Sequence, residues 1–181
     1  AQPYIKQAEV TADGGKIDES VRSSKMHFLS NTQEAQEMAQ EIKRRTHAAT
    51  KLPYDHMEAL QIQRYGPPRD GGARVDFYRP HVDSMYGNDR RIATMIYYLS
   101  DVEEGGETMF PYVWRNTSGR PHYGHDVVKA IDEALPIFKT ECDNPSSAVL
   151  KVKPRKGAAV LFYTLLTTGK LDTLSIHSGC P

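Results

Sequence analysis

The chain has 181 residues, which is enough for one domain with a sizeable hydrophobic core but too few for a second full domain of ordinary size. Lys plus Arg and Asp plus Glu both total 23, so no excess of charge favours nucleic acid or an anionic membrane surface as a partner. The longest apolar-rich runs, residues 93–99 and 158–163, are much shorter than the roughly 20 residues of a membrane span. We therefore expect a single domain over residues 1–181, cut at both ends, with no membrane contact by this segment.

The first predicted element is a helix over residues 30–50. Ser30 and Gln33 are three residues apart, which is the spacing of a capping box. Ala35, Met38 and Ile42 follow at helical spacing, and the remaining positions are mostly charged. The charged positions indicate a solvated face and require no function.

From residue 58 onward, short runs rich in β-branched and aromatic residues alternate with Gly and Pro clusters, which predicts mostly antiparallel strands. The predicted strands cover residues 59–65, 76–83, 92–102, 150–153, 158–164 and 171–178. Two long loops are predicted at 66–75 and 112–144, the second with a short helix around 126–135. Loops of this length in a compact domain are often binding or lid segments. One leading helix followed by many strands predicts an α+β domain built around a β-sandwich or barrel.

A candidate metal site is formed by two histidines and one aspartate. His81 and Asp83 are two residues apart, and in a strand this spacing directs both side chains to the same face. His177 lies 94 residues after Asp83 in another predicted strand, so it can supply a third ligand from across the sheet. Two His and one carboxylate form the facial triad of non-haem Fe(II) oxygenases, which leaves coordination positions open. A lone His-x-Asp pair is weak, so the interpretation depends on its context.

The context consists of four further motifs in a fixed order. They are RIATMIYYLSDV at 91–102, EGGETMFP at 104–111, VKPRKGAAVLF at 152–162 and DTLSIHSGCP at 172–181. This order resembles the catalytic domain of the prolyl 4-hydroxylases, including the plant and algal enzymes and the collagen-modifying ones. The resemblance extends from about Arg22 to Pro181 and is most specific from Leu60 onward.

The resemblance implies a double-stranded β-helix (jelly-roll) core with flanking N-terminal helices. It implies Fe(II) bound by His81, Asp83 and His177, which are both the metal ligands and the catalytic residues. It also implies 2-oxoglutarate as co-substrate and ascorbate as the reductant that maintains the iron. The matched positions around the co-substrate are Tyr65, Tyr98 and Thr108, and those that meet the peptide are Tyr78 and Arg91.

The function implied is that of a procollagen-proline 4-dioxygenase-like enzyme. Such an enzyme uses O2 and 2-oxoglutarate to convert prolines of proline-rich proteins to 4-hydroxyproline, with succinate and CO2 as by-products. A lysine that pairs with the far carboxylate of 2-oxoglutarate in the family would lie beyond Pro181. Two alternatives remain open: an oxygenase of the same fold that acts on another residue or target, and a non-catalytic peptide-binding module.

The two cysteines, Cys142 and Cys180, are compatible with one bridge or with two free thiols. Because similar plant and algal enzymes have cysteines at comparable places, the resemblance favours a bridge. A bridge implies an oxidising compartment, the lumen of the endoplasmic reticulum or Golgi, with the cytoplasm as the alternative. His122 and His125 are three residues apart, but no third ligand is near them in the sequence, so we interpret them as surface residues.

Overall fold

The structure, a computed structural model, describes residues 6–7, 18–29, 32–66, 75–84, 91–114 and 126–181. The chain divides into two compact units. The first comprises Ala1–Ala8 and Ser24–Arg64, and the second comprises Glu9–Ser23 and Tyr65–Pro181. In the described residues, no helix has both the length and the apolar character needed to cross a membrane.

The first unit contains the predicted leading helix and a small sheet. Helix α1 covers Gln33–Thr50, and its N-cap is Thr32, whose hydroxyl accepts a hydrogen bond from the Ala35 amide at 3.1 Å. The predicted cap, Ser30, lies outside the described residues. The antiparallel sheet has the order β1-β2-β3, and its strands are β1 (Lys6–Gln7), β2 (Lys25–Phe28) and β3 (Gln61–Arg64). A 3-10 turn, η3 (Tyr54–His56), precedes β3.

The second unit contains two antiparallel sheets. One has the order β4-β9-β6-β7 and is formed by β4 (Tyr78–His81), β9 (His177–Gly179), β6 (Thr108–Trp114) and β7 (Val149–Val152). The other pairs β5 (Ala93–Tyr97) with β8 (Ala159–Tyr163). The first and last strands of the unit, β4 and β9, are neighbours, as a jelly-roll winding requires and a simple meander does not. This winding places the two histidine-bearing strands side by side.

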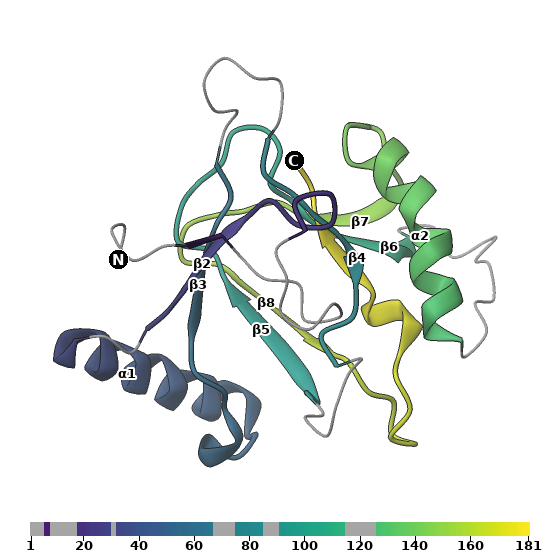
Figure 1. Ribbon diagram of the computed structural model, residues 1–181. Coiled ribbons are helices and arrows are strands. Elements are labelled where there is room, and N and C mark those ends of the chain that lie inside the picture. The colour runs from purple at the N-terminus through teal and green to yellow at the C-terminus, as the bar shows by residue number, and fades with distance from the viewer. Residues whose placement is uncertain (1–5, 8–17, 30–31, 67–74, 85–90, 115–125) are drawn as a thin grey trace. The chain divides into compact units, whose positions relative to one another are not determined.

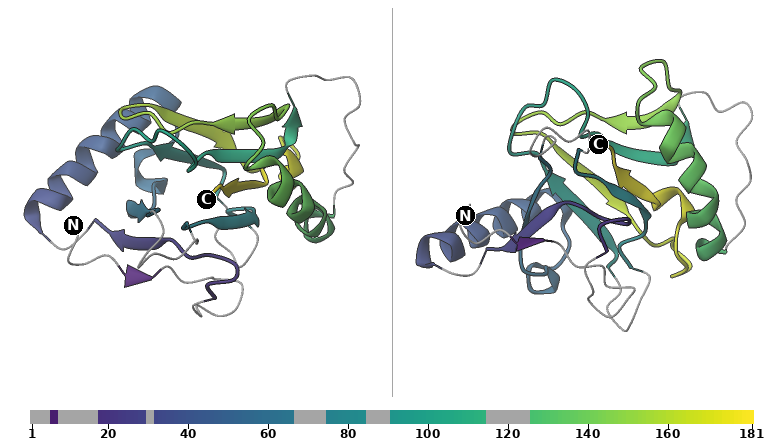
Figure 2. Two further views of the ribbon diagram at one scale, coloured as in Figure 1. Left: turned by 90° about the horizontal axis from the view of Figure 1, so that it is seen from above. Right: turned by 45° about the horizontal axis from the view of Figure 1, so that its top comes forward.

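The sheet β4-β9-β6-β7 is covered on one face by helix α2 (Val127–Glu141), shown in green in Figure 1. Val127, Ala130 and Ala134 of α2 pack against Tyr112 and Ile176 in a buried cluster. In both views of Figure 2, α2 lies beside the segment that leads into β9. The two sheets also contact each other, because the ring of Phe110 on β6 meets the ring of Phe162 on β8 edge to face, with centroids 5.1 Å apart.

The structure corrects the predicted loop at residues 112–144. Strand β6 extends to Trp114, and its first five residues are all buried, so it lacks the alternation that marks a half-exposed strand. Pro111 also argues against a central strand, but the β6–β7 register shifts between Phe110 and Trp114, and such a bulge tolerates proline. The predicted short helix is confirmed as α2, which is longer than expected and is capped by Asp126.

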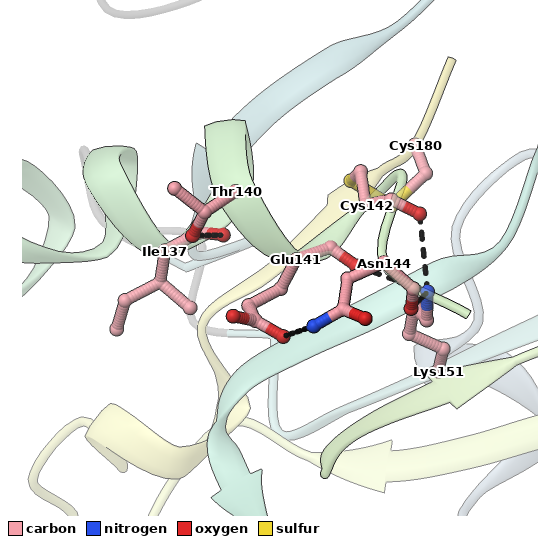
Figure 3. Close-up of a disulfide and its surroundings, with 7 residues drawn as sticks. All are labelled: Ile137, Thr140, Glu141, Cys142, Asn144, Lys151 and Cys180. Atoms are coloured by element: carbon pink, nitrogen blue, oxygen red, sulfur yellow. Dashed lines mark hydrogen bonds between the residues drawn. A yellow bond between two sulfur atoms is a disulfide. The ribbon is translucent and has the colours of Figure 1, made fainter. Parts of the chain in front are cut away.

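The predicted disulfide is present between Cys142 and Cys180. It links the C-terminus of α2 to the residue directly after β9 (Figure 3). Beside it, the Lys151 ammonium donates hydrogen bonds to the carbonyl oxygens of Glu141, Cys142 and Asn144 at 2.8–3.0 Å. A cation at this place stabilises the end of a helix, where carbonyl groups lack partners within the helix. The segment that carries His177 is therefore tied to α2 only three residues after the histidine.

Candidate metal centre and co-substrate site

The sequence placed His81 and Asp83 on one strand, but the structure places only His81 there. Strand β4 ends at His81, and Asp83 lies in the turn that follows. The two side chains still meet, because His81 Nε2 is 3.5 Å from Asp83 Oδ1. The proximity was predicted correctly, but the strand geometry invoked for it was wrong at Asp83.

His177 joins this pair from the neighbouring strand. His81 and His177 are paired residues in the β4–β9 register, and their ring centroids are 4.3 Å apart. His177 Nε2 is 3.8 Å from Asp83 Oδ2. The potential ligand atoms of the three residues all lie within 4.8 Å of one another, so the structure brings the predicted triad together.

The hydrogen bonds of both rings direct free lone pairs into this cluster. His81 Nδ1 is 2.8 Å from the Arg79 carbonyl oxygen, and His177 Nδ1 is 3.0 Å from that of Ser175. Because a carbonyl can only accept, each Nδ1 carries the proton, and Nε2 of a neutral ring is left as an acceptor. A carbonyl partner of this kind typically fixes the tautomer of a metal-binding histidine.

The electrostatics of the cluster favour a cation. Burial lowers the pKa of His177 to about 4, so this imidazole is neutral at physiological pH. Burial alone would raise the pKa of Asp83, but the histidine rings and the Thr94 hydroxyl bring it well below its usual range. A carboxylate and imidazole nitrogens that converge in this way form a donor set suited to a divalent transition metal such as Fe(II).

Tyr78, predicted to meet the peptide, lies directly beside the triad. Its ring stacks on the ring of His81, with centroids 3.6 Å apart and an interplanar angle of 21°. The Arg22 guanidinium carbon lies 4.5 Å from the centre of the Tyr78 ring, a cation–π arrangement. Burial raises the pKa of Tyr78, so its hydroxyl stays protonated. Arg22 was not predicted, because no motif surrounds it and 55 residues separate it from Tyr78 in the sequence.

Two residues near the start of β5 hold Asp83. The Thr94 hydroxyl donates to Asp83 Oδ2 at 2.6 Å, and Arg91 Nη1 donates to the Asp83 carbonyl oxygen at 3.1 Å. Arg91 was predicted to contact the peptide, which stays a prediction, and in the structure its side chain bonds Asp83. Thr94 was not predicted as a site residue, although it lies inside the motif at 91–102.

The predicted co-substrate residues gather around β9. The Tyr98 hydroxyl donates to Thr108 Oγ1 at 2.9 Å, and Thr108 is paired with Gly179 in the β6–β9 register. The Tyr65 ring lies against Gly179 so closely that a Cβ there would be 2.9 Å from Tyr65 Cε1. Burial raises the pKa of Tyr98, so it remains a donor. All three residues therefore surround the strand that carries His177.

The glycines of the EGGET motif shape the turn before Thr108. Gly105 and Gly106 have φ values of 72° and 69°, a conformation that L side chains rarely adopt. The Gly106 amide donates to the Pro181 carbonyl oxygen at 3.2 Å, and the Cys180 amide donates to Glu107. The turn thus fixes the end of the β9 segment next to the start of β6.

We predict that Gly105→Ala destabilises the protein by about 1–3 kcal/mol more than Gly157→Ala, the usual range for overpacking. Both glycines have positive φ, so both variants carry the same backbone strain. A Cβ on Gly105 would lie 2.4 Å from the Pro181 carbonyl oxygen, whereas a Cβ on Gly157 meets nothing within 4 Å. Urea unfolding of both variants measures the difference. If both variants lost the same free energy of unfolding, Pro181 would not pack against this turn.

His122 and His125, interpreted from the sequence as surface residues, and most of the loop at 66–75 lie outside the described residues.

Comparison with known proteins assigns the family. The family model of the 2OG-Fe(II) oxygenase superfamily matches residues 60–181. Probable prolyl 4-hydroxylase 3 of Arabidopsis thaliana is 34% identical over 183 residues, and probable prolyl 4-hydroxylase 9 of the same plant is 34% identical over 186. Each match covers 100% of this chain and 57% of the relative, so the chain spans little more than half the length of these proteins.

The chain is similar to the crystal structure of a Pseudomonas putida prolyl-4-hydroxylase, with a TM-score of 0.53 and 19% sequence identity. The match covers 98% of this chain and 70% of the Pseudomonas putida chain. At this identity, the match concerns the fold, and it confirms the predicted α+β jelly roll. In the described residues, one α-helix, α1, precedes the strands of the second unit, where the resemblance implied more than one. The family match covers the triad and implies Fe(II) and 2-oxoglutarate as cofactor and co-substrate. The chain belongs to the 2OG-Fe(II) oxygenase superfamily.

Proposed function

We propose that this protein hydroxylates prolyl residues of peptides at C4, with O2 and 2-oxoglutarate as co-substrates. The observation that carries the proposal is the convergence of His81, Asp83 and His177 in a member of this superfamily. The choice of proline as the target is supported by the relatives, which are named prolyl 4-hydroxylases or probable prolyl 4-hydroxylases.

His81 Nε2, His177 Nε2 and one oxygen of Asp83 would hold Fe(II), and three protein ligands leave positions open for the co-substrates. When bound, Fe(II) and 2-oxoglutarate supply the oxidative chemistry: 2-oxoglutarate and O2 yield succinate, CO2 and one oxygen atom for the substrate. The protein keeps both imidazoles in the metal-binding tautomer through the carbonyls of Arg79 and Ser175.

Around this centre, the side chains keep water out and place the co-substrate. The rings of Phe110 and Phe162 lie 5.9 Å and 4.7 Å from the ring of His177, which makes an apolar wall on that side of the centre. Tyr65, Tyr98 and Thr108 provide the polar groups that receive 2-oxoglutarate. Its far carboxylate requires a cation, and we propose that a lysine beyond Pro181 supplies this cation.

We propose that the substrate is an extended, proline-rich segment that binds beside Tyr78 and Arg91. A proline-rich chain already populates polyproline II, so it loses little conformational entropy on binding, and it favours aromatic surfaces. The Tyr78 ring is adjacent to His81, which places an aromatic surface next to the metal ligands. Arg91 lies beside Asp83, whose carbonyl oxygen it bonds, and a guanidinium can donate to peptide carbonyls, which in polyproline II have no internal partner.

We also propose that the protein works in the secretory pathway, in the lumen of the endoplasmic reticulum or Golgi, and uses ascorbate to keep the iron reduced. The support for the compartment is the disulfide between Cys142 and Cys180, because such bridges persist mainly in oxidising environments. A cytoplasmic location remains the alternative, and fractionation of cells that express the full-length protein distinguishes the two.

The proposed reaction is tested with the full-length protein, Fe(II), 2-oxoglutarate and ascorbate. The substrates are a proline-rich peptide and matched peptides in which lysine or alanine replaces proline. Mass spectrometry should show one added oxygen atom on proline alone, coupled to succinate release. If 2-oxoglutarate is consumed with a lysine peptide and no proline is modified, the protein is an oxygenase with a different target. If neither peptide stimulates turnover but the proline peptide binds, the protein is a peptide-binding module.

Tyr78→Phe is expected to raise the peptide KM by about tenfold, the loss of roughly one hydrogen bond of 1.4 kcal/mol, and to leave metal binding unchanged. The phenylalanine ring keeps the stack on His81, so the variant loses the hydroxyl alone, together with its hydrogen bond to Arg22. Tyr163→Phe is the matched control, because Tyr163 is 52% exposed on β8. If the Tyr78→Phe variant kept the wild-type peptide KM, the Tyr78 hydroxyl would have no role in peptide binding.

A further inference from the structure

Asp83 differs from the two histidines in how its position is held. His81 and His177 lie in β4 and β9 and share the hydrogen-bonded ladder of these strands. Asp83 lies in a turn beyond β4. A carboxylate in a turn requires support from elsewhere if it is to keep one orientation towards a metal ion.

Thr94 provides this support from the second sheet. Its hydroxyl is 2.6 Å from Asp83 Oδ2, the length of a strong hydrogen bond to an ionised acceptor. Thr94 lies within β5 and is paired with Phe162 on β8, so its backbone is fixed by a regular antiparallel ladder. Because threonine is β-branched, its side chain also has few rotamers. The donor is therefore more rigidly placed than the carboxylate it contacts.

The backbone of Asp83 is held by the same segment. Arg91 Nη1 donates to the Asp83 carbonyl oxygen at 3.1 Å. The Arg91 backbone is fixed in turn, because its carbonyl accepts a hydrogen bond from the hydroxyl of Thr164, which is fully buried. Residues 91–94 thus contact both the main chain and the side chain of Asp83.

The two oxygens of the carboxylate have different surroundings. Oδ2 accepts the Thr94 hydroxyl at 2.6 Å and lies 3.8 Å from His177 Nε2, whereas Oδ1 has no such hydroxyl in the described residues and faces His81 Nε2 at 3.5 Å. A carboxylate that engages a metal through both oxygens occupies two coordination positions. If one oxygen is occupied by a hydroxyl, the carboxylate binds through the other, and one more position stays open.

We propose that Thr94 is a positioning residue of the metal centre: its hydroxyl occupies Asp83 Oδ2 and restricts Asp83 to binding the metal through Oδ1. This inference rests on the metal site of the proposed function. Thr94 itself touches neither the metal nor the substrate. It acts through Asp83, and it thereby keeps coordination positions free for 2-oxoglutarate and O2.

The test compares metal and co-substrate binding in variants of the full-length protein. Mn2+ is titrated into the metal-free protein by calorimetry, and 2-oxoglutarate is then titrated into the Mn2+-loaded protein. Thr94→Val has nearly the same shape without the hydroxyl, and Thr94→Ala serves as a smaller variant should valine disturb folding. Both are expected to weaken Mn2+ binding by about tenfold. This is the lower end of the loss in metal affinity that follows when a residue hydrogen-bonded to a metal ligand is replaced. Both are also expected to weaken 2-oxoglutarate binding to the loaded protein, because a position is lost to the second oxygen.

Thr94→Ser restores the hydroxyl and is expected to return both affinities to near the wild-type values. Thr140→Val is the matched control, because the Thr140 hydroxyl bonds only carbonyl oxygens of its own helix, Pro136 and Ile137, and it should have no effect. The proposal is wrong if Thr94→Val or Thr94→Ala, folded as judged by its thermal transition, binds Mn2+ and 2-oxoglutarate like the wild type. If the wild type binds Mn2+ no better than His177→Ala does, the proposed metal site itself fails, which is a distinct result.

Discussion

His177→Ala is expected to abolish turnover and to weaken metal binding by more than about a hundredfold. This loss exceeds the one expected from removing a residue that only hydrogen-bonds a metal ligand. His177 supplies one of three converging ligand atoms. It is 5% exposed, so no neighbouring solvent provides a ready substitute for its imidazole as a ligand. Metal binding is measured by calorimetry with Mn2+, and turnover by succinate release from 2-oxoglutarate.

His56→Ala is the control for this prediction. His56 lies in η3 of the first unit and is exposed, so its loss should change neither quantity. If His177→Ala kept wild-type Mn2+ affinity and turnover, the assignment of His177 as a ligand would fail.

Removal of the disulfide is expected to have the largest effect on stability. A bridge across 38 residues reduces the entropy of the unfolded chain by an amount worth about 4 kcal/mol in the loop-closure model. The double variant Cys142→Ser, Cys180→Ser should lose roughly this free energy of unfolding in urea. It should also bind Mn2+ more weakly, because Cys180 anchors the chain three residues after His177.

Chemical reduction of the wild type provides the matched comparison, since it breaks the same bond without changing any side chain. Thiol counting on the denatured, unreduced protein should find no free thiol. Unchanged stability of the double variant, or two free thiols in the untreated protein, would contradict the role given to the bridge.

The sequence was sufficient to locate most strands of the second unit, but it could not reveal all of them. Runs such as 158–164 carry β-branched and aromatic residues between Gly and Pro, and β8 lies within that run. Strand β6 was not predicted at all, because both of its faces are covered and its burial results from α2 and from contacts such as that with Phe162. Such burial depends on tertiary packing and leaves no period in the sequence.

For the site, the spacing and order of motifs identified the ligands but not what holds them. His81, Asp83 and His177 carry the chemistry themselves, so their residue types were informative. Thr94 and Arg22 act through a neighbour: one bonds Asp83 and the other lies on the Tyr78 ring. A threonine in a strand and an arginine far from any motif are ordinary in sequence, and only the fold shows which groups they meet.

Anomalous diffraction from crystals grown with Mn2+ shows most directly whether His81, Asp83 and His177 hold one metal ion. We expect a single strong anomalous peak in the second unit, in direct coordination with His81 Nε2, His177 Nε2 and Oδ1 of Asp83, with Oδ2 of Asp83 still bonded to Thr94. No peak at this position, or a peak bound by other residues while the three side chains remain without metal, would contradict it.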